Sequence, residues 1–438
     1  MHSYLVTVAT DVTTGVATNC LDQATNANSG SANTSCSLRD ALAAAKLSAT
    51  SAQPASITFA QTAPTILTLA QGTLNLPSYT TIQGATSGGG TSLTNLITVD
   101  GNNSVTVFTQ ASGINQSAIN NLIVTRGYTA QVGAGLFMSG TLAVSNCTFI
   151  ANQAAISGGA ISNSGGNLTV FGSTFANNVA QTGYGGALDN YAVGTMTVSN
   201  STFSGNQGFY GGAIYNSGTG TASTTSIAAS TISGNTGTIG GGIYNLGTMT
   251  IASSIVNGNT MTDCAGIACS PQWAYVLFTA ATPTVIDTPS VTLAFTDSLG
   301  NTFSQTEGTG PFSSPAGIAS GFGSYFYYNT SGLDTTNIGG QSFGGLFVFA
   351  PSNGATLNPI NITYTGKSFN ITQIYYPLLL SVNQNVSGQT AAQINLSPLG
   401  NNGGPTQTML PLPGSTALCV INPSTARGTD QRLSLIHI

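Results

Sequence analysis

Acidic side chains are the first residues to test for chemistry, because hydrolysis of a glycosidic bond takes two carboxyl groups about 5 to 9.5 Å apart. Between residues 57 and 265 the chain has only Asp100, Asp189 and Asp263. Asp100 begins Asp-Gly-Asn, a common turn sequence. A lyase for acidic sugars needs a basic group and often Ca²⁺, and Arg126 is the only Lys or Arg in this range. We therefore expect that the protein is not an enzyme. The alternative is a polysaccharide lyase or a glycoside hydrolase.

Tyrosines are the candidates for ligand binding, because each ring combines an apolar body with a polar tip. Five tyrosines lie within or near the repeated corners, namely Tyr184, Tyr191, Tyr210, Tyr215 and Tyr244, and Tyr215 and Tyr244 occupy the same repeat position. Exposed aromatic rows suit sugar rings or protein partners. We take Tyr215, Tyr244 and Tyr210 as candidate binding residues. The alternative is a tyrosine stack that only supports the fold.

The cysteines suggest two short closed loops. Cys20 and Cys36 bracket a polar stretch, Cys264 and Cys269 bracket four residues, and both pairs are candidate structural disulfides in an oxidising compartment. Cys147 lies inside repeated sequence and is expected to be a small packed side chain. A metal site needs clustered Cys and His. With two histidines in the whole chain, we expect no metal site and no cofactor.

A degenerate repeat of about 25 residues must position these side chains. One signature is a glycine pair followed by a small and an apolar residue, at 158–161, 185–188, 211–214 and 240–243. It alternates with an apolar residue followed three positions later by Asn, at 149–152, 175–178, 203–206, 232–235 and 256–259. A period in this range predicts a stacked solenoid in which each repeat forms one coil.

Asparagines recur at the expected corners of the coils in two series. The first is Asn163, Asn190, Asn216 and Asn245, and the second is Asn152, Asn178, Asn206, Asn235 and Asn259. Asn tolerates left-handed backbone and bonds to the local chain, and stacked amides can bond to the coils above and below. We predict structural amide ladders, with a row of ligand-binding amides as the alternative. The repeat also places Asp189 level with Ser162, Tyr215 and Tyr244, so no second acid stands beside it.

Short runs between the corners alternate apolar and polar residues, as at 142–144, 168–170, 196–198 and 249–251. Every second side chain then points inward. Two or three such strands per coil, with coils about 4.8 Å apart, predict an all-β, right-handed parallel β-helix, a pectin-lyase-like solenoid.

Residues 1–55 are the predicted N-terminal cap, with the one credible helix at 36–46 and Ser37 as its N-cap. Leu38, Ala41, Leu42 and Ala45 fall on one face of that helix. An amphipathic helix over the first coil would block an edge that is otherwise open to pairing.

The rest of the chain divides by composition. Residues 56–269 are the predicted parallel β-helix. Residues 270–382 lose the glycine signature and are rich in aromatic residues, and alternating runs at 291–295 and 345–349 predict an inserted antiparallel β module. Residues 383–432 are predicted to form a final coil and a closing segment.

Residues 433–438 back-translate to CTG TCT CTT ATA CAC ATC, which resembles a transposon end used in sequencing libraries. We therefore expect this tail to be non-native and the natural chain to continue.

Charge is scarce, at 4% of residues and a net charge of −5. No basic patch is present, which argues against binding to nucleic acid or to an anionic membrane surface. No apolar run reaches the roughly 20 residues that span a bilayer, and no signal peptide is visible at the start. Recognition would therefore use hydroxyls, amides and aromatic rings.

The paired tetrapeptides GGA[ILV] and FxxN resemble the repeat signature of the polymorphic outer membrane proteins of bacteria. The segment 36–41, Cys-Ser-Leu-Arg-Asp-Ala, is similar to the CSLREA motif near the start of bacterial β-helix surface proteins, with Asp40 in place of Glu. The stretch 399–413 looks like the closing segment of such proteins. The resemblance covers most of the chain except the aromatic-rich module.

This resemblance implies a secreted or cell-surface passenger, and several proteins of that type act in adhesion. It suggests an extracellular location, with an outer-membrane anchor outside this sequence, and a ligand that is a glycan or a cell-surface protein. A passive structural stalk is a further alternative. Right-handed β-helices also host pectate lyases and polygalacturonases, but a shared fold does not transfer their chemistry. The oligomeric state stays open.

Overall fold

The computed structural model describes residues 1–11, 15–25, 35–88, 93–218, 223–266, 394–402, 406–412 and 415, and the backbone of five strands between residues 275 and 375. The chain divides into two compact units. One consists of Met1–Cys264 with Asn385–Ile438, and the other of Ala265–Gln384. The second unit is close to the range 270–382 expected for the inserted module. The expected non-native tail, 433–438, lies outside the described residues.

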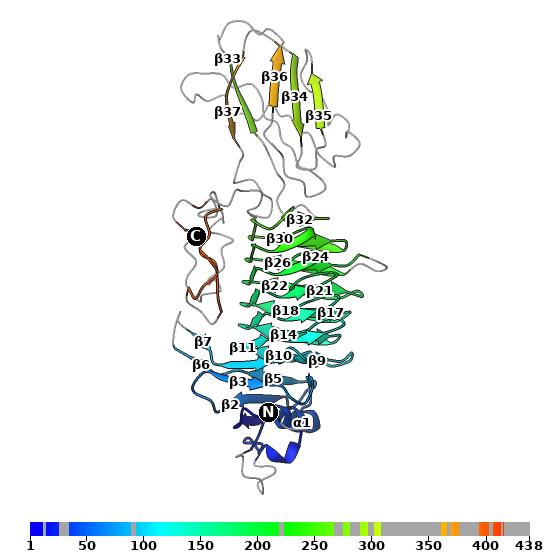
Figure 1. Ribbon diagram of the computed structural model, residues 1–438, viewed down its shortest axis with the longest axis vertical. Helices are drawn as coiled ribbons and strands as arrows, with labels where there is room; N and C mark the ends of the chain where they lie inside the picture. Colours follow the sequence, from blue (N-terminus) through cyan, green and yellow to red (C-terminus); the bar gives the residue numbers. More distant parts are fainter. Residues whose placement is uncertain are drawn as a thin grey trace. The chain divides into compact units, whose positions relative to one another are not determined.

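The first unit is a parallel β-solenoid whose coils stack in the order of the sequence (Figure 1). The chain visits four sheets in each clean repeat, and we call them A, B, C and D in the order of the visit. The solenoid prediction is confirmed, but the expected two or three strands per coil is wrong. The turn before the glycine pair contributes a further short strand, because its backbone pairs with the coils on either side.

Sheet A contains β1 (His2–Val6), β2 (Ala55–Phe59), β5 (Thr80–Gln83), β10 (Ser117–Asn120), β14 (Thr141–Ser145), β18 (Asn167–Phe171), β22 (Thr195–Ser199), β26 (Thr224–Ala228) and β30 (Thr248–Ala252). Sheet B contains β3 (Thr65–Thr68), β8 (Ile97–Asp100), β11 (Leu122–Thr125), β15 (Thr148–Ile150), β19 (Thr174–Ala176), β23 (Thr202–Ser204), β27 (Thr231–Ser233) and β31 (Ile255–Val256). Sheet C contains β12 (Tyr128–Thr129), β16 (Gln153–Ala154), β20 (Val179–Ala180), β24 (Gln207–Tyr210) and β28 (Thr236–Ile239). Sheet D contains β4 (Leu74–Asn75), β9 (Phe108–Gln110), β13 (Leu136–Met138), β17 (Ile161–Ser164), β21 (Leu188–Tyr191), β25 (Ile214–Asn216), β29 (Ile243–Asn245) and β32 (Cys264–Ala265).

The core is a column of repeat-equivalent side chains. Phe149, Phe175 and Phe203 are fully buried and pair in register on sheet B. Their rings stack with centroids 5.3 and 4.7 Å apart and nearly parallel planes. Ile232 continues the column in the next coil. The apolar position of the FxxN signature is therefore the core position, and burying it requires the neighbouring coils.

The glycine pair has two separate physical reasons. Gly185 has φ +60°, a left-handed conformation that most residues avoid. Gly186 lies so close to the next coil that a Cβ atom would sit 2.2 Å from the carbonyl oxygen of Gly212. The first glycine turns the chain, and the second lets adjacent backbones pack.

Both asparagine series form ladders, as predicted. In the longer one the side-chain Nδ2 of Asn152 donates to Oδ1 of Asn178 at 3.0 Å, and the pattern continues through Asn206, Asn235 and Asn259. Asn259 donates to Oδ1 of Asp263 at 2.9 Å. The other ladder joins Asn163, Asn190, Asn216 and Asn245 at 2.8 to 2.9 Å. All of these amides except the partly exposed Asn259 are buried, which supports a structural role over ligand binding.

One detail of the asparagine prediction is wrong. The ladder residues do not themselves adopt the left-handed conformation. It falls on the residue before each member of the longer ladder, namely Ala151, Asn177, Gly205, Gly234 and Gly258. A left-handed residue turns the corner, and the next side chain points inward. There it bonds to an asparagine side chain of one neighbouring coil and to a backbone carbonyl of the other, as Asn152 does with Asn178 and Val124.

Cys147 is packed as expected, in the first position of a third ladder. Its backbone N–H donates to Oγ of Ser173, whose own N–H donates to Ser201, and the series continues through Ser230 to Ser254. Burial raises the pKa of the Cys147 thiol to about 12. Cys147 is therefore a serine substitute in a corner column, and it is unreactive in the native state.

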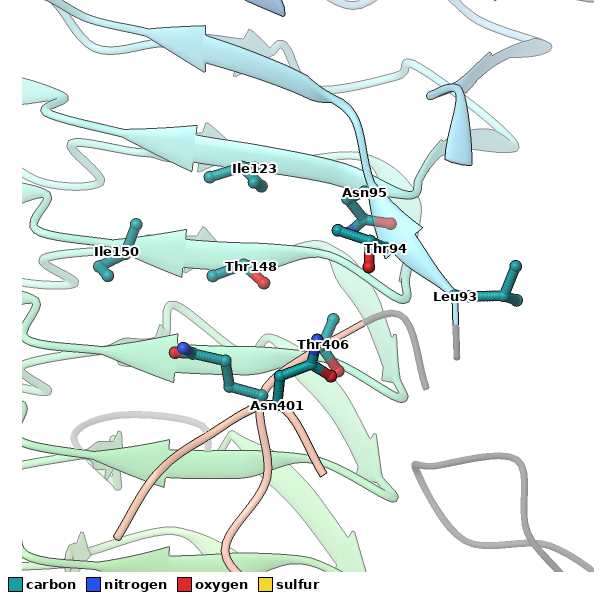
Figure 2. A pocket seen from close by; sticks show the side chains of 9 residues that line it. Leu93, Thr94, Asn95, Ile123, Thr148, Ile150, Asn401 and Thr406 are labelled. Atoms are coloured by element: carbon teal, nitrogen blue, oxygen red, sulfur yellow. The ribbon is translucent and has the colours of Figure 1, made fainter. Parts of the chain in front are cut away.

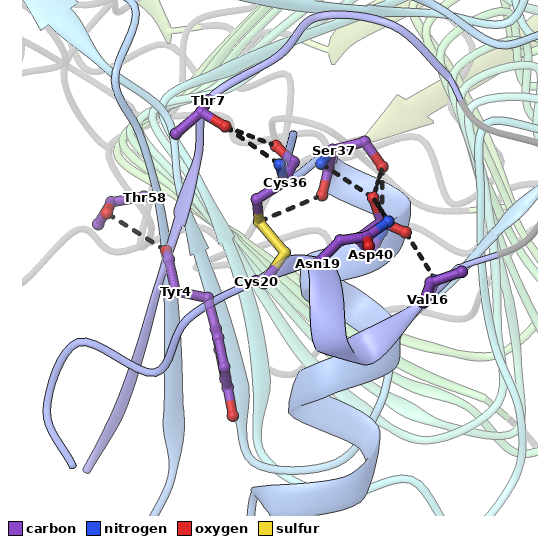
Figure 3. The surroundings of a disulfide bond; sticks show 9 residues. All are labelled: Tyr4, Thr7, Val16, Asn19, Cys20, Cys36, Ser37, Asp40 and Thr58. Carbon is purple, nitrogen blue, oxygen red and sulfur yellow. Dashed lines mark hydrogen bonds between the residues drawn. A yellow bond between two sulfur atoms is a disulfide. The ribbon is translucent and has the colours of Figure 1, made fainter. Parts of the chain in front are cut away.

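The N-terminal cap combines a helix with a disulfide (Figure 3). Helix α1 (Leu38–Ser48) follows the short helix η1 (Ala17–Asn19), and Ser37 and Asp40 form a complete capping box. The four residues predicted to share a face, Leu38, Ala41, Leu42 and Ala45, are buried. Cys20 and Cys36 form the predicted disulfide. Cys264 is also disulfide-bonded, and Cys269, its expected partner, lies outside the described residues.

The described part of residues 383–432 does not add the predicted final coil. It pairs with itself through antiparallel bridges, Leu396 to Pro411 and Gly400 to Thr408. Thr406 donates a hydrogen bond to the carbonyl of Gly172, and Thr174 donates to the carbonyl of Gln407. This C-terminal segment therefore lies against the outer face of sheet B, to which one of its side chains and one of its backbone carbonyls are hydrogen-bonded.

The second unit contains antiparallel pairs, as predicted for the inserted module. β33 (Tyr275–Ala280) pairs with β37 (Phe369–Tyr375), and β34 (Ser290–Thr296) pairs with β35 (Thr302–Glu307) and β36 (Asn361–Thr365). The predicted strand at 291–295 falls within β34. The predicted strand at 345–349 and the aromatic run at 325–328 lie outside the described residues.

Asn206→Ala should lower the free energy of unfolding by about 3 kcal/mol or more, because it removes four hydrogen bonds to buried groups of Asn178, Asn235 and Phe175. The measurement is the urea midpoint of the full chain. The control is Asn167→Ala, at an exposed position of sheet A. An equal effect of both substitutions would contradict the ladder.

Mass-spectrometric mapping of alkylated cysteines should distinguish disulfide-bonded cysteines from the buried free thiol. Without reductant, Cys20 and Cys36 should stay unlabelled even in denaturant, because they form a disulfide. Cys147 should be labelled only in denaturant, because it is buried. Labelling of Cys20 in the native protein would show that the cap disulfide is absent.

Candidate functional site

Four tyrosines meet where sheets C and D adjoin. Tyr210 ends β24, and Tyr215 and Tyr244 lie on β25 and β29. Tyr184 precedes the glycine pair of its coil and bridges to Tyr210. Ring centroids are 4.5 Å apart for Tyr184 and Tyr215, 5.2 Å for Tyr184 and Tyr210, and 5.3 Å for Tyr210 and Tyr244. We call these four residues the tyrosine cluster.

The structure brings together the three tyrosines selected from the sequence. Tyr215 is only 6% exposed, and Tyr210 and Tyr244 are half-buried. A supporting role therefore fits Tyr215 best. The sequence selection left out Tyr184, which is 38% exposed. A signal for it was available, because Tyr184 and Tyr210 each directly precede a glycine pair and so hold the same place in successive coils.

The orientation of the rings decides what the cluster offers to a ligand. Tyr184, Tyr210 and Tyr244 stack face to face with interplanar angles of 17° and 26°. Their faces are therefore largely covered by one another, and their edges carry the phenol hydroxyls. Phe209 is turned by 70° to Tyr210 and is 42% exposed. Phe209 is thus the ring in this group whose face is not part of the stack.

Exposed apolar residues continue the cluster along the solenoid. Ile156, Tyr184, Phe209 and Ile239 come from four successive coils and are 38 to 42% exposed. The N–H of Tyr184 donates to the carbonyl of Ile156, Phe209 donates to Gly183, and Tyr210 pairs with Ile239. We call these four residues the apolar stripe. Rows of this kind, bordered by polar side chains, mark interaction surfaces.

Asp189 lies in the column beneath the cluster. It pairs in register with Ser162 on one side and Tyr215 on the other, as the repeat alignment predicted. The hydroxyl of Ser162 donates to its Oδ2 at 3.3 Å, and its Oδ1 accepts no hydrogen bond within the described residues. Burial raises the pKa of Asp189 to about 8, and the Ser162 hydrogen bond offsets only part of that shift. At neutral pH this carboxyl is therefore mainly protonated.

The other two acids of the solenoid serve the fold. Asp100 forms an ion pair with the guanidinium of Arg126 and accepts the backbone N–H of Asn102 at 2.8 Å, which confirms its turn role. Asp263 ends the longer asparagine ladder. Neither lies in the column of Asp189. The described acids therefore do not supply the pair of facing carboxyl groups that glycoside hydrolysis needs.

A cavity of about 270 Å³ lies between the outer face of sheet B and the C-terminal segment (Figure 2). Ile123 and Ile150 come from neighbouring strands β11 and β15, and Thr94 and Asn95 belong to β7 (Thr94–Asn95), which pairs with β6 (Thr86–Ser87). Asn401 and Thr406 close it from the C-terminal segment. The cavity is slightly below the usual range for ligand pockets, about 300 to 1,000 Å³. We therefore place the candidate site at the tyrosine cluster.

No family model, curated protein or solved structure matches this sequence. In the part of the chain that the structure describes, no helix is long and apolar enough to cross a bilayer. Within the same residues no group of three or more His, Cys, Asp or Glu side chains is placed to hold a metal ion. The assignment of the candidate site therefore rests on the geometry of the tyrosine cluster.

Asp189→Asn should flatten the dependence of stability on pH. A carboxyl with a raised pKa in the folded state binds more protons when folded, so the free energy of unfolding falls as pH rises from about 4 to about 8. The variant should melt at a higher temperature than the parent at pH 8 and show a smaller difference at pH 4. Melting curves of both proteins at these two pH values test this. A constant difference at both pH values would show that Asp189 does not titrate in this window.

Proposed function

We propose that this protein is a secreted or cell-surface β-solenoid that binds glycans or cell-surface proteins through the tyrosine cluster and the apolar stripe. The observation that carries the proposal is the exposed Phe209 ring beside three stacked tyrosines. Rings of this kind, at the border of apolar and wet surface, are enriched at binding sites.

The cysteines support a location outside the cytoplasm. Cys20 and Cys36 are disulfide-bonded, and so is Cys264. Disulfides persist mainly in oxidising compartments. The repeat signatures resemble those of the bacterial polymorphic outer membrane proteins, which is consistent with a surface passenger that acts in adhesion.

Binding fits the site better than catalysis. Asp189 is 3% exposed and its neighbours in the column are Ser162 and Tyr215. A single neutral carboxyl in such a place cannot act as both acid and base across a scissile bond. The tyrosine hydroxyls and Phe209 can hold a ligand without changing it.

Binding of the labelled full chain to panels of immobilised glycans and purified surface glycoproteins tests the proposal. We expect saturable binding to at least one panel member, and a loss of about tenfold or more in Phe209→Ala, because the lost ring contact corresponds to roughly 1.4 kcal/mol or more. The matched control is Leu246→Ala, which removes an apolar side chain of similar exposure, 47%, outside the cluster.

Two results would contradict the proposal. Absence of saturable binding to both panels would favour a passive structural stalk. Binding with product release, seen as new reducing ends or unsaturated sugars, would favour a polysaccharide-degrading enzyme instead.

A further inference from the structure

We propose that the ligand of the tyrosine cluster is an extended, uncharged glycan that runs along the solenoid axis with about one sugar residue per coil. This inference rests on the proposed function and narrows it to one class of ligand. Three features of the described residues carry it: spacing, hydrogen-bonding chemistry and charge.

The spacing of the site matches an extended sugar chain. Tyr184, Tyr210 and Tyr244 belong to successive coils, and their ring centroids are 5.2 and 5.3 Å apart. This interval is close to the length that one pyranose adds to an extended, equatorially linked chain. The apolar stripe covers four coils, so at about 4.8 Å per coil it has the length of a three- or four-residue oligosaccharide.

The polar groups of the site suit hydroxyls. The phenol hydroxyls of Tyr184, Tyr210 and Tyr244 make no hydrogen bond to other described residues, so each is available as donor and acceptor. Exposed amide and hydroxyl side chains border the stripe on sheet C and its flanks, namely Gln181, Gln207, Thr236 and Thr238. A row of neutral donors and acceptors beside an aromatic face is the chemistry that a polyhydroxylated ring requires.

Phe209 supplies the stacking face. Because the tyrosines cover one another's faces, they present hydroxyl-bearing edges, whereas Phe209 is turned by 70° from Tyr210. The apolar C–H face of one sugar residue can lie on Phe209 while its hydroxyls reach the tyrosine edges. The two kinds of aromatic residue therefore have different roles, and different substitutions test them.

Charge excludes the acidic glycans. Arg126 is the only Lys or Arg between residues 57 and 265, and its guanidinium is already paired with Asp100. Asp189, which is in register with Tyr215, offers a uronate no positive charge. A polyanion would find no counter-charge here, whereas an uncharged glycan needs none.

Isothermal titration of the full chain with two matched series of probes tests this inference. One series is β-1,4-linked glucose oligosaccharides from two to six residues, and the other is oligogalacturonates of the same lengths. We expect affinity for the uncharged series to rise with length up to about four residues and then level off, at least tenfold above the acidic series, with little dependence on salt. Phe209→Ala should lose about tenfold and Tyr210→Phe a few-fold, whereas Leu246→Ala should bind like the parent.

Tyr210→Phe keeps the ring stack and removes one hydroxyl, so its effect does not depend on folding. Stronger binding of the acidic series, or an affinity that falls steeply with salt, would overturn the uncharged-glycan assignment but leave the proposed function. Binding of a purified surface protein that is lost in Phe209→Ala, without binding of either sugar series, would do the same. Affinity that does not change with length would overturn the axial arrangement. If neither sugars nor proteins bind, the proposed function fails together with this inference.

Discussion

The structure depends on hydrogen bonds that each coil can make only with its neighbours. Asn206 shows why: it accepts from the backbone and side chain of Asn178 and donates to Asn235 in the following coil. Each rung passes one amide donor onward, so the series must end on a group that only accepts. Asp263 is that group. A slip of one coil against another would leave buried amides unpaired, which costs about 1 to 3 kcal/mol each. The ladders therefore hold the coils in register.

Because the register is fixed, the neighbours of each outward-pointing residue are set by the column in which it lies. Asp189 is placed between Ser162 and Tyr215 by the pairing of sheet D, not by its own preference. Its burial is unfavourable for a carboxylate, which is why its pKa rises. The same pairing brings Tyr215 and Tyr244 together, while sheet C supplies Tyr210. The stack that supports the corner and the surface that faces solvent are thus parts of one aromatic group.

The described charges mostly stabilise the cap and the corners. Arg39 pairs with Asp11, which also accepts the backbone N–H groups of Ala70 and Gln71, and so ties the cap to the first coils. Burial alone would raise the pKa of Asp22, but hydrogen bonds from Thr25 and His2 and from backbone N–H groups outweigh it and hold the pKa below its usual range. Because these charged side chains are paired within the fold, the rest of the described surface presents mainly hydroxyls, amides and aromatic rings. These groups favour an uncharged ligand.

The sequence by itself determined the coil. Gly185 and Gly186, the Phe175 column and the asparagine series could be read from the repeat, because each reports a local backbone geometry or an inward position that recurs every coil. The alignment of Asp189 with Ser162 and Tyr215 followed from the same period. Tertiary structure alone decided what happens outside the coil. The repeat gives Tyr184 the same place as Tyr210, but only the packing of sheet C against sheet D brings its ring onto Tyr215. The C-terminal segment docks on sheet B rather than extending the stack, through Thr406 and Gly172, which are 234 residues apart. A periodic sequence specifies contacts between adjacent coils, but it carries no local signal for contacts between the outer surface and a distant, non-repeating segment.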